Sequence, residues 1–328
     1  QAKKKNGARI MLEPGGKYKC ASSINIAGDF GQGLEIIGQN SIIQATHDGP
    51  CISVGNYAEP ASEYRIKFRM SGVNVAGSGS GSKAASSVGV LIQECAEVSL
   101  SDCIIRSANI GLKLTGGLIC NFSNLTIRDN AIGIYARATS HFACNSNVFN
   151  VCRIIKNNVS AINYHDFPNS AVTFIGCEIE GNHLDGTADD GTRVCEFINA
   201  GELNLIGCHF EANKGEFGLQ FSGGSKAKTL NVIGCEIIQE TANVMFVQSG
   251  AFNVIGGRIW NGRAKNNIIV DAGVSGFVSN CDTTVSGSTG SCIVIKDGHL
   301  NIGGIDLVST INELNKDVAM LKSRSISK

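Results

Sequence analysis

Four glutamates in the second half of the chain have the residue type and spacing needed for acid–base chemistry. Glu178 and Glu180 stand two residues apart, and Glu211 and Glu236 follow in later segments of similar sequence. On parallel strands about 4.8 Å apart, alternate residues share a face, so these carboxyl groups would form one patch. Glycosidases place their two carboxyl groups about 5 to 9.5 Å apart, which such strands can provide. Crowding of like charges would keep a proton on one carboxyl group while another stays ionised.

Basic and aromatic side chains follow the same spacing and flank the glutamates. Arg153 precedes them, His209 lies among them, and Arg258 and Trp260 come after. We expect these four to contact substrate: the arginines would position acidic or acylated sugars, and Trp260, the only tryptophan, would stack on a sugar ring. A metal site that uses His209 has no supporting ligand spacing. The alternative is structural, because rows of opposite charge also stabilise a solvated sheet face, and Trp260 would equally suit an oligomer interface.

These residues belong to a sequence repeat. The segments 172–179, 203–210, 230–237 and 252–259 share a pattern of alternating apolar residues, then Ile-Gly-Cys or Ile-Gly-Gly, then one more apolar residue. Weaker copies extend in both directions, with a spacing of about 27 residues. With the cysteine taken as position zero, apolar residues fall at −5, −3, 0 and +2, which predicts two short strands joined by a bend at the glycine.

Each repeat is too small to bury a core alone, and no helical pattern lies between its strands. Stacked repeats would form parallel strands around a dry interior. We therefore expect an all-β fold, a right-handed, single-stranded parallel β-helix of about eleven coils, roughly 50 Å long. The predicted organisation is an N-terminal cap with lead-in strands at 1–33, the β-helix at 34–308, and a short amphipathic helix at 309–328. That helix would either cap the last coil or join chains as a coiled coil.

Composition narrows the function classes. The 328 residues carry a formal net charge of zero, so we expect no nucleic-acid partner and no attraction to an anionic membrane. No apolar run is long enough to insert into a membrane, and no cofactor motif is present. Of the 13 cysteines, six occupy the zero position of the repeat and none forms a CxxC pair. We interpret them as small interior fillers, which indicates assembly in a reducing cytosol.

The opening segment 9–18, Arg-Ile-Met-Leu-Glu-Pro-Gly-Gly-Lys-Tyr, followed by Ile36-Ile37-Gly38, resembles the start of a known family. This family is the pectate-lyase-like parallel β-helix of bacteriophage tailspikes and capsule depolymerases. The resemblance implies a homotrimer on the virion tail, assembled in the host cytoplasm, with an upstream tail-attachment domain. It also implies binding, and often cleavage, of a bacterial surface polysaccharide by hydrolysis or elimination. The family has no fixed catalytic motif, so no residue role is transferred by it.

Three hypotheses follow from the sequence. The first is a depolymerase that draws its acid and base from Glu178, Glu180, Glu211 and Glu236. The second is an adhesin of the same shape that binds glycan without cleaving it. The third is a structural spike of the virion.

Overall fold

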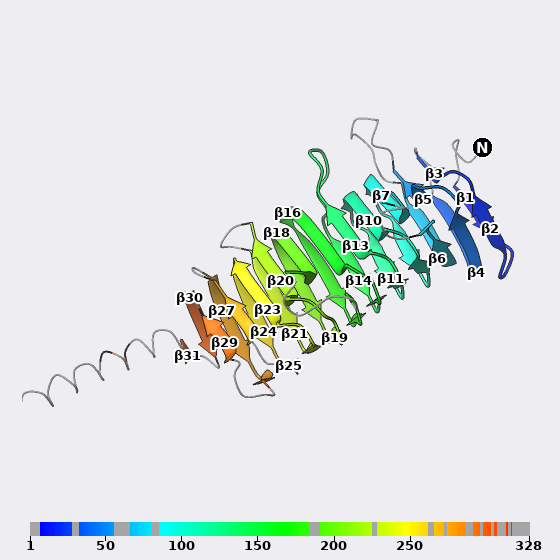
Figure 1. Ribbon diagram of the computed structural model, residues 1–328. Helices are drawn as coiled ribbons and strands as arrows, with labels where there is room; N and C mark the ends of the chain where they lie inside the picture. The colour runs from blue at the N-terminus through cyan, green and yellow to red at the C-terminus, as the bar shows by residue number, and fades with distance from the viewer. Residues whose placement is uncertain are drawn as a thin grey trace, which may run out of the picture.

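The computed structural model is a rod of stacked β-strands, with successive coils running from the N-terminus at one end toward the C-terminus at the other (Figure 1). It describes residues 7–27, 33–55, 66–79, 85–183, 191–224, 228–261, 266–271, 274–285, 291–295, 298–302 and 305–306, with the single positions 313 and 316. Within these residues, no helix is long and apolar enough to cross a membrane.

The strands form three parallel ladders, which we call the first, second and third faces of the rod. The first face contains β1 (Ala8–Met11), β4 (Leu34–Ala45), β6 (Phe68–Ala76), β8 (Ser99–Ser101), β11 (Asn121–Ser123), β14 (Asn147–Asn150), β16 (Ser160–Ile175), β18 (Arg193–Ile206), β21 (Thr229–Ile233), β24 (Ala251–Ile255), β27 (Val274–Ser279) and β30 (Gly298–Ile302). The second face contains β2 (Lys17–Cys20), the ends of β4 and β6, β9 (Ile104–Arg106), β12 (Thr126–Arg128), β15 (Arg153–Ile155), β17 (Glu178–Glu180), β19 (His209–Glu211), β22 (Glu236–Gln239), β25 (Arg258–Asn261) and β28 (Asp282–Val285).

The third face contains β3 (Ile24–Ile26), β5 (Pro50–Val54), β7 (Val88–Ala96), β10 (Ile110–Leu118), β13 (Ile132–Arg137), the starts of β16 and β18, β20 (Phe217–Gly223), β23 (Asn243–Ser249), β26 (Asn266–Val270) and β29 (Ser291–Ile295). The short β31 (Ile305–Asp306) pairs antiparallel with β30. All the remaining strand pairs that the structure describes are parallel, and each strand pairs with its counterpart in the next coil. Equivalent residues of successive coils therefore form straight columns.

The interior columns are those that the repeat predicts. Cys177, Cys208 and Cys235 are at most 2% exposed, and the residues two positions later are equally buried. Neighbouring rings stack in the column at −3, with Phe149 centred 4.7 Å from Phe122 and 4.5 Å from Phe174. The twelve cysteines whose side chains the structure describes are free thiols. The expectation of a cysteine-lined apolar interior is confirmed.

The bend at −1 has a left-handed backbone. Gly176, Gly207 and Gly234 have φ values of 57°, 58° and 60°, a region that costs glycine little. Val151 occupies the same position with φ 53°, which is unusual for a β-branched residue. The bend separates the first face from the second, so residues at −2 and +1 emerge on different faces of the rod.

A second buried column is polar. Asn130, Asn157, Asn182 and Asn213 follow the corner between the second and third faces, and each is fully buried. Each amide nitrogen donates to the next side chain along the rod, at 3.1 Å, 2.9 Å, 2.9 Å and finally 3.0 Å to Gln239. This asparagine ladder gives the buried backbone at the corner its hydrogen-bond partners.

The fold prediction is confirmed as an all-β, right-handed parallel β-helix. The β-helix has about nine turns, slightly fewer than the eleven expected from the repeat. Strands β1 to β3 pair in parallel with β4 and β5 and so form the first turn. The helix predicted at 309–328 lies almost entirely outside the described residues.

Candidate active site

The eight residues predicted to form the site lie together on the second face. β15, β17, β19, β22 and β25 are consecutive there, and they bring Arg153, Glu178, His209, Glu236 and Arg258 into one outward column. The adjacent outward column contains Glu180, Glu211 and Trp260, with Ile238 between the last two. The structure therefore confirms the predicted register and orientation, because the residues between these positions point into the core.

Arg153 binds Glu178 through two hydrogen bonds. Its Nε lies 2.6 Å from Glu178 Oε2 and its Nη2 lies 3.1 Å from Oε1. This forked, charge-assisted contact lowers the pKa of Glu178 to about 2, with a further contribution from a hydrogen bond with Glu180. Glu178 is therefore ionised at any pH at which the protein would act.

Glu180 shifts in the opposite direction. Its pKa is raised, first by the hydrogen bond with the Glu178 carboxylate, then by partial burial and by the charges of Glu178 and Glu211. Arg153 is closer to Glu178 and offsets this rise only in part. The pKa values of the two carboxyl groups thus move apart, which is the direction that acid–base catalysis requires.

His209 connects the remaining carboxylates. Its Nε2 lies 3.1 Å from Glu211 Oε2, and its Nδ1 lies 3.3 Å from Glu236 Oε2. Glu236 also lies 3.9 Å from Arg258, whose guanidinium stands 5.8 Å from the centre of the Trp260 ring. The Trp260 ring thus has a cation over it, and its use as a sugar platform stays a prediction. Among the described residues, no group of three His, Cys, Asp or Glu side chains is arranged to hold a metal ion.

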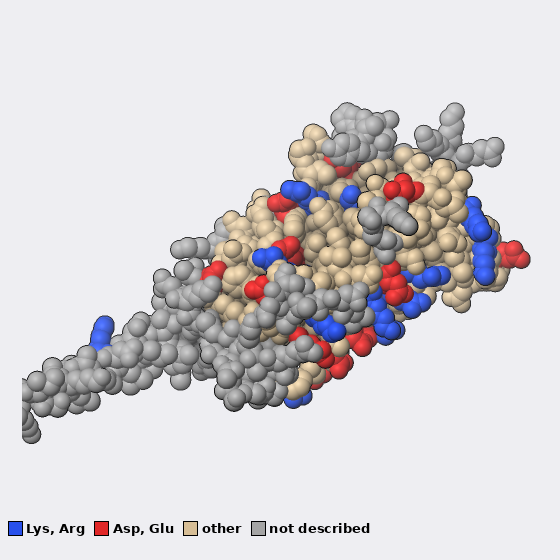
Figure 2. Space-filling view, in the orientation of Figure 1, with Lys and Arg blue, Asp and Glu red and all other residues tan. Residues whose placement is uncertain are grey.

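The second face changes charge along the rod. On the lower edge in Figure 2, Lys, Arg, Asp and Glu atoms are interleaved, with Asp and Glu atoms gathered in its middle part. In the strand register, Arg106, Arg128 and Arg153 on β9, β12 and β15 precede the glutamates of β17 to β22. The glutamate patch is thus the acidic half of a longer charged track.

The sequence comparison matches a family model described as "Right handed beta helix region" over residues 22–200, which is more than half of the chain. The chain belongs to the right-handed β-helix family. The match covers β3 to the middle of β18 and so includes Arg153, Glu178 and Glu180. No curated protein sequence matches the chain significantly.

Solved structures share the fold of this β-helix at low sequence identity. A protein of Geobacillus virus E2 (ORF18) is 17% identical with a TM-score of 0.52, over 91% of this chain and 55% of that one. The catalytic unit of an α-1,3-glucanase from Streptomyces thermodiastaticus is 10% identical with a TM-score of 0.58, over 90% and 61%. The tailspike gp42 of Acinetobacter phage vb_AbaP_AS12 is 10% identical with a TM-score of 0.56, over 91% and 58%. The β-helix thus spans less than two thirds of each of these chains.

A polar cluster on the third face was not predicted from the sequence. His165 Nε2 lies 2.9 Å from Glu196 Oε2, and Arg193 Nε lies 3.4 Å from Oε1 of the same carboxyl group. The hydrogen bond from His165 lowers the pKa of Glu196. Only the strand register brings these residues together, because the third-face segments vary too much in sequence for a column to be recognised. In this cluster a single carboxylate is held between two basic groups, and among the described residues no ion pair brings a second carboxylate to it.

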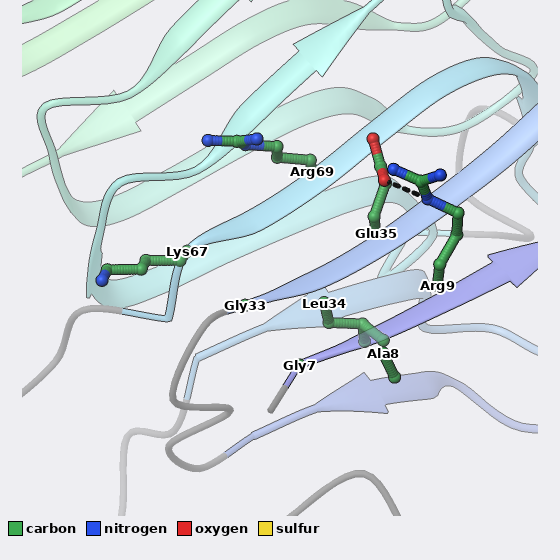
Figure 3. A pocket seen from close by; sticks show the side chains of 8 residues that line it. All are labelled: Gly7, Ala8, Arg9, Gly33, Leu34, Glu35, Lys67 and Arg69. Carbon is green, nitrogen blue, oxygen red and sulfur yellow. Dashed lines mark hydrogen bonds and ion pairs between the residues drawn. The ribbon is translucent and has the colours of Figure 1, made fainter. Parts of the chain in front are cut away.

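A pocket of about 370 Å³ opens on the first face at the N-terminal coils. Figure 3 shows Arg9 and Glu35 pointing toward one another from neighbouring strands, while Lys67 and Arg69 extend away from that pair. Arg9 Nε lies 2.6 Å from Glu35 Oε2. Glu35 is the only carboxylate among the described residues that line this pocket, and it is already paired. The acid–base chemistry is therefore better placed on the second face.

The Arg153–Glu178 pair predicts a pH-dependent stability. The pKa of Glu178 falls from 4.5 to about 2 on folding, so its ionised form stabilises the β-helix above about pH 4.5, and this contribution disappears as the pH falls toward 2. Arg153→Gln is expected to lower the free energy of unfolding at pH 7 by no more than about 1 kcal/mol, because the pair is partly exposed. Urea titrations should show that difference shrinking as the pH falls from about 4.5 toward 2. Arg106→Gln, which removes a cation without an ion-pair partner among the described residues, should show no such trend; a constant difference for Arg153→Gln would contradict the assignment.

Proposed function

We propose that this β-helix binds a bacterial surface polysaccharide, capsule or O-antigen, and cleaves it at the glutamate patch. The observation that carries the proposal is the split between Glu178, whose pKa is lowered to about 2, and Glu180, whose pKa is raised. The likeness to a tailspike and to a glucanase supports a glycan as the ligand class. A role as the rod of a tailspike-like protein on the virion tail agrees with the likeness to viral proteins.

In this mechanism Glu180 is the proton donor to the leaving glycosidic oxygen. Glu178, held ionised by Arg153, keeps that proton on Glu180 through its negative charge. Glu211 is paired with Glu180 in register on the next coil, about 4.8 Å away between backbones, and acts as the base or nucleophile. Glu236, His209 and Arg258 continue the column and bind the neighbouring sugar unit. Glu178 and Glu180 do not bracket a scissile bond, because their carboxyl groups bond each other.

The second candidate is a glycan-binding adhesin without catalysis. It is favoured by the pairing of the charged groups, since Glu178 is bound by Arg153 while Glu211 and Glu236 both contact His209. Such a ladder stabilises the outer surface of a sheet even if no bond is broken. The two candidates share the binding face and differ only in turnover.

Incubation of the protein with purified capsule and O-antigen preparations tests the proposal. The expected result is a rise in reducing ends together with a fall in polymer size; an ultraviolet-absorbing unsaturated product would assign elimination rather than hydrolysis. Binding without new chain ends would establish the adhesin. Neither binding nor cleavage across the preparations would leave the structural spike as the function.

We also propose that the chain forms a homotrimer through the first face. Ile175, Ile206, Ile233 and Ile255 lie in register there and are 37% to 41% exposed. The parallel outward column contains Asn204, Asn231 and Asn253, which bond one another at 2.8 Å. An exposed, uncharged, partly apolar surface over four coils has the composition of an interface core.

A single charge should disrupt this interface. Ile233→Lys is expected to convert the trimer to monomers, because a lysine ammonium buried against apolar partner surface lacks a counter-charge. Light scattering coupled to size-exclusion chromatography measures the mass directly. Val159→Lys is the matched control, since Val159 is 48% exposed but lies off the isoleucine stripe. A monomeric wild type, or an unchanged mass in Ile233→Lys, would refute the interface.

A further inference from the structure

A second pocket, of about 500 Å³, lies on the second face at the first coils of the rod. Its walls come from β2, β4, β6 and β9, and the residues lining it are Lys17, Tyr18, Lys19, Ile42, Gln44, Ala76, Gly77, Arg106 and Ser107. This volume is within the range of pockets that hold small ligands. The pocket belongs to the same two outward columns as the glutamate patch, but at their N-terminal end.

The hollow exists because one coil lacks a long outward side chain. Lys19, Gln44, Ala76 and Arg106 occupy the same outward column on successive coils. Ala76 is therefore the floor, while Gln44 and Arg106 form walls about one strand spacing, 4.8 Å, to either side. Gly77 follows directly and adds no side chain of its own. A substitution at Ala76 would fill the hollow without changing its charge.

The lining is cationic and uncompensated. Three of its side chains carry positive charge and none carries a carboxylate. Within the described part of the chain, no ion pair engages Lys17, Lys19 or Arg106. Ile42, in register with Lys17, adds apolar surface, whereas the Tyr18 side chain, in register with the buried Ile43, lies on the opposite side of β2 from Lys17 and Lys19. Cations beside an aliphatic wall fit a sugar ring that bears an anionic group.

We infer that this pocket binds a carboxylate-bearing sugar of an acidic polysaccharide, so that the substrate of the glutamate patch is an anionic glycan lying along the rod. This inference rests on the proposed function for the identity of the ligand as a glycan. The pocket and Glu180 are four coils apart in the same column, about 19 Å at the strand spacing. In this column Arg128 follows Arg106 and the buried Ile155 comes next, with Arg153 beside it in the adjacent outward column. One chain of several sugar units would reach both sites.

Binding of short glycans tests the inference apart from catalysis. Isothermal titration of the full chain would use oligogalacturonate, the same oligosaccharide with its carboxylates methyl-esterified, and a sulfated oligosaccharide of equal length. The expected result is binding of the free uronate, at least tenfold weaker binding of the ester, and weakening by salt because exposed charges are screened. Loss of a charge-assisted contact corresponds to about a tenfold change in Kd, so Arg106→Gln should show that loss.

Two further variants separate charge from shape. Ala76→Gln places in the hollow the side chain that Gln44 has one coil earlier, and it should weaken uronate binding by about tenfold without loss of charge. Arg69→Gln removes a cation from the same strand, β6, but on the first face, so it should leave binding unchanged.

The possible results distinguish the carboxylate pocket from the catalytic proposal. Equal binding of acid and ester, preference for the sulfated chain, or equal effects of Arg106→Gln and Arg69→Gln would each overturn the carboxylate pocket. Cleavage of a neutral surface polysaccharide by a protein that binds no uronate would also overturn it while leaving the proposed function intact. Uronate binding that depends on Arg106 but is accompanied by no cleavage of any polysaccharide would support the pocket and reject the catalytic proposal.

Discussion

Replacing Glu180 with glutamine is expected to lower kcat on the cleaved polysaccharide by about a hundredfold to ten-thousandfold, with little change in KM. Glutamine keeps the shape and the hydrogen bond to Glu178 but cannot donate a proton, and proton donation contributes about that much to catalysis. The loss should appear at every pH. Reducing-end kinetics measure the rate, and binding of the intact polysaccharide to the variant measures whether the site is still formed.

Glu178→Gln gives the contrasting result. Without the negative charge beside it, the Glu180 carboxyl group loses its main source of elevated pKa. Activity at low pH should then be retained. As the pH rises, activity should be lost earlier than in the wild type, so the alkaline limb of the pH–rate profile moves to lower pH. Glu202→Gln, an exposed carboxylate on the first face, is the control for removal of a charge. Full activity in Glu180→Gln would exclude Glu180 as the proton donor.

The substitution with the largest expected effect on stability is Asn182→Leu. The Asn182 amide nitrogen donates to Ile154 O and Asn213 Oδ1, both at 2.9 Å. Its oxygen accepts from the backbone N–H of Asn157 at 3.0 Å and from the Asn157 amide at 2.9 Å. Leucine has a similar size but leaves these buried groups without partners, which costs about 1–3 kcal/mol for each group left unsatisfied. We expect a loss of about 4 kcal/mol in the free energy of unfolding.

Chemical denaturation followed by circular dichroism measures this loss. Asn253→Leu is the matched control, because Asn253 donates a 2.8 Å bond to Asn231 in the outer asparagine row and is only half-buried. Water can replace that bond in the monomeric Ile233→Lys background, in which both variants are compared, so the control should lose less than about 1 kcal/mol. Similar losses in both variants would show that the interior ladder has no special role in the stability of the coils.

The sequence repeat was enough to predict part of the candidate site. Because the period along a strand is two and coils stack in register, the spacing of Glu178 and His209 from their preceding cysteines was enough to place both in one outward column. The same reasoning could have found the asparagine ladder, since Asn157, Asn182 and Asn213 each stand five residues after a repeat cysteine. That signal was missed because asparagine is more typical of turns than of a buried column.

Other features carry no sequence signal of this kind. The third-face cluster depends on the pairing of β16 with β18, which sets Asn163 against Glu196 and His165 against Ile198. The insertions between these strands vary in length, so the register cannot be counted from the chain. The split in pKa between Glu178 and Glu180 depends on which of the two the Arg153 side chain reaches, and only side-chain geometry decides that.

The sequence by itself determined the winding of this protein: the identity of the interior columns, the face on which the glutamates emerge and the position of the left-handed bends. These follow from alternation and repetition, because each coil must bury the same positions as its neighbours. Only the tertiary structure decided which charged groups form ion pairs and which asparagines form a buried hydrogen-bonded ladder. It also decided where a short side chain, Ala76, leaves a pocket lined by cations. These contacts join residues in neighbouring coils, about one repeat apart in the chain. They depend on side-chain distances between coils, which the pattern of residue types does not specify.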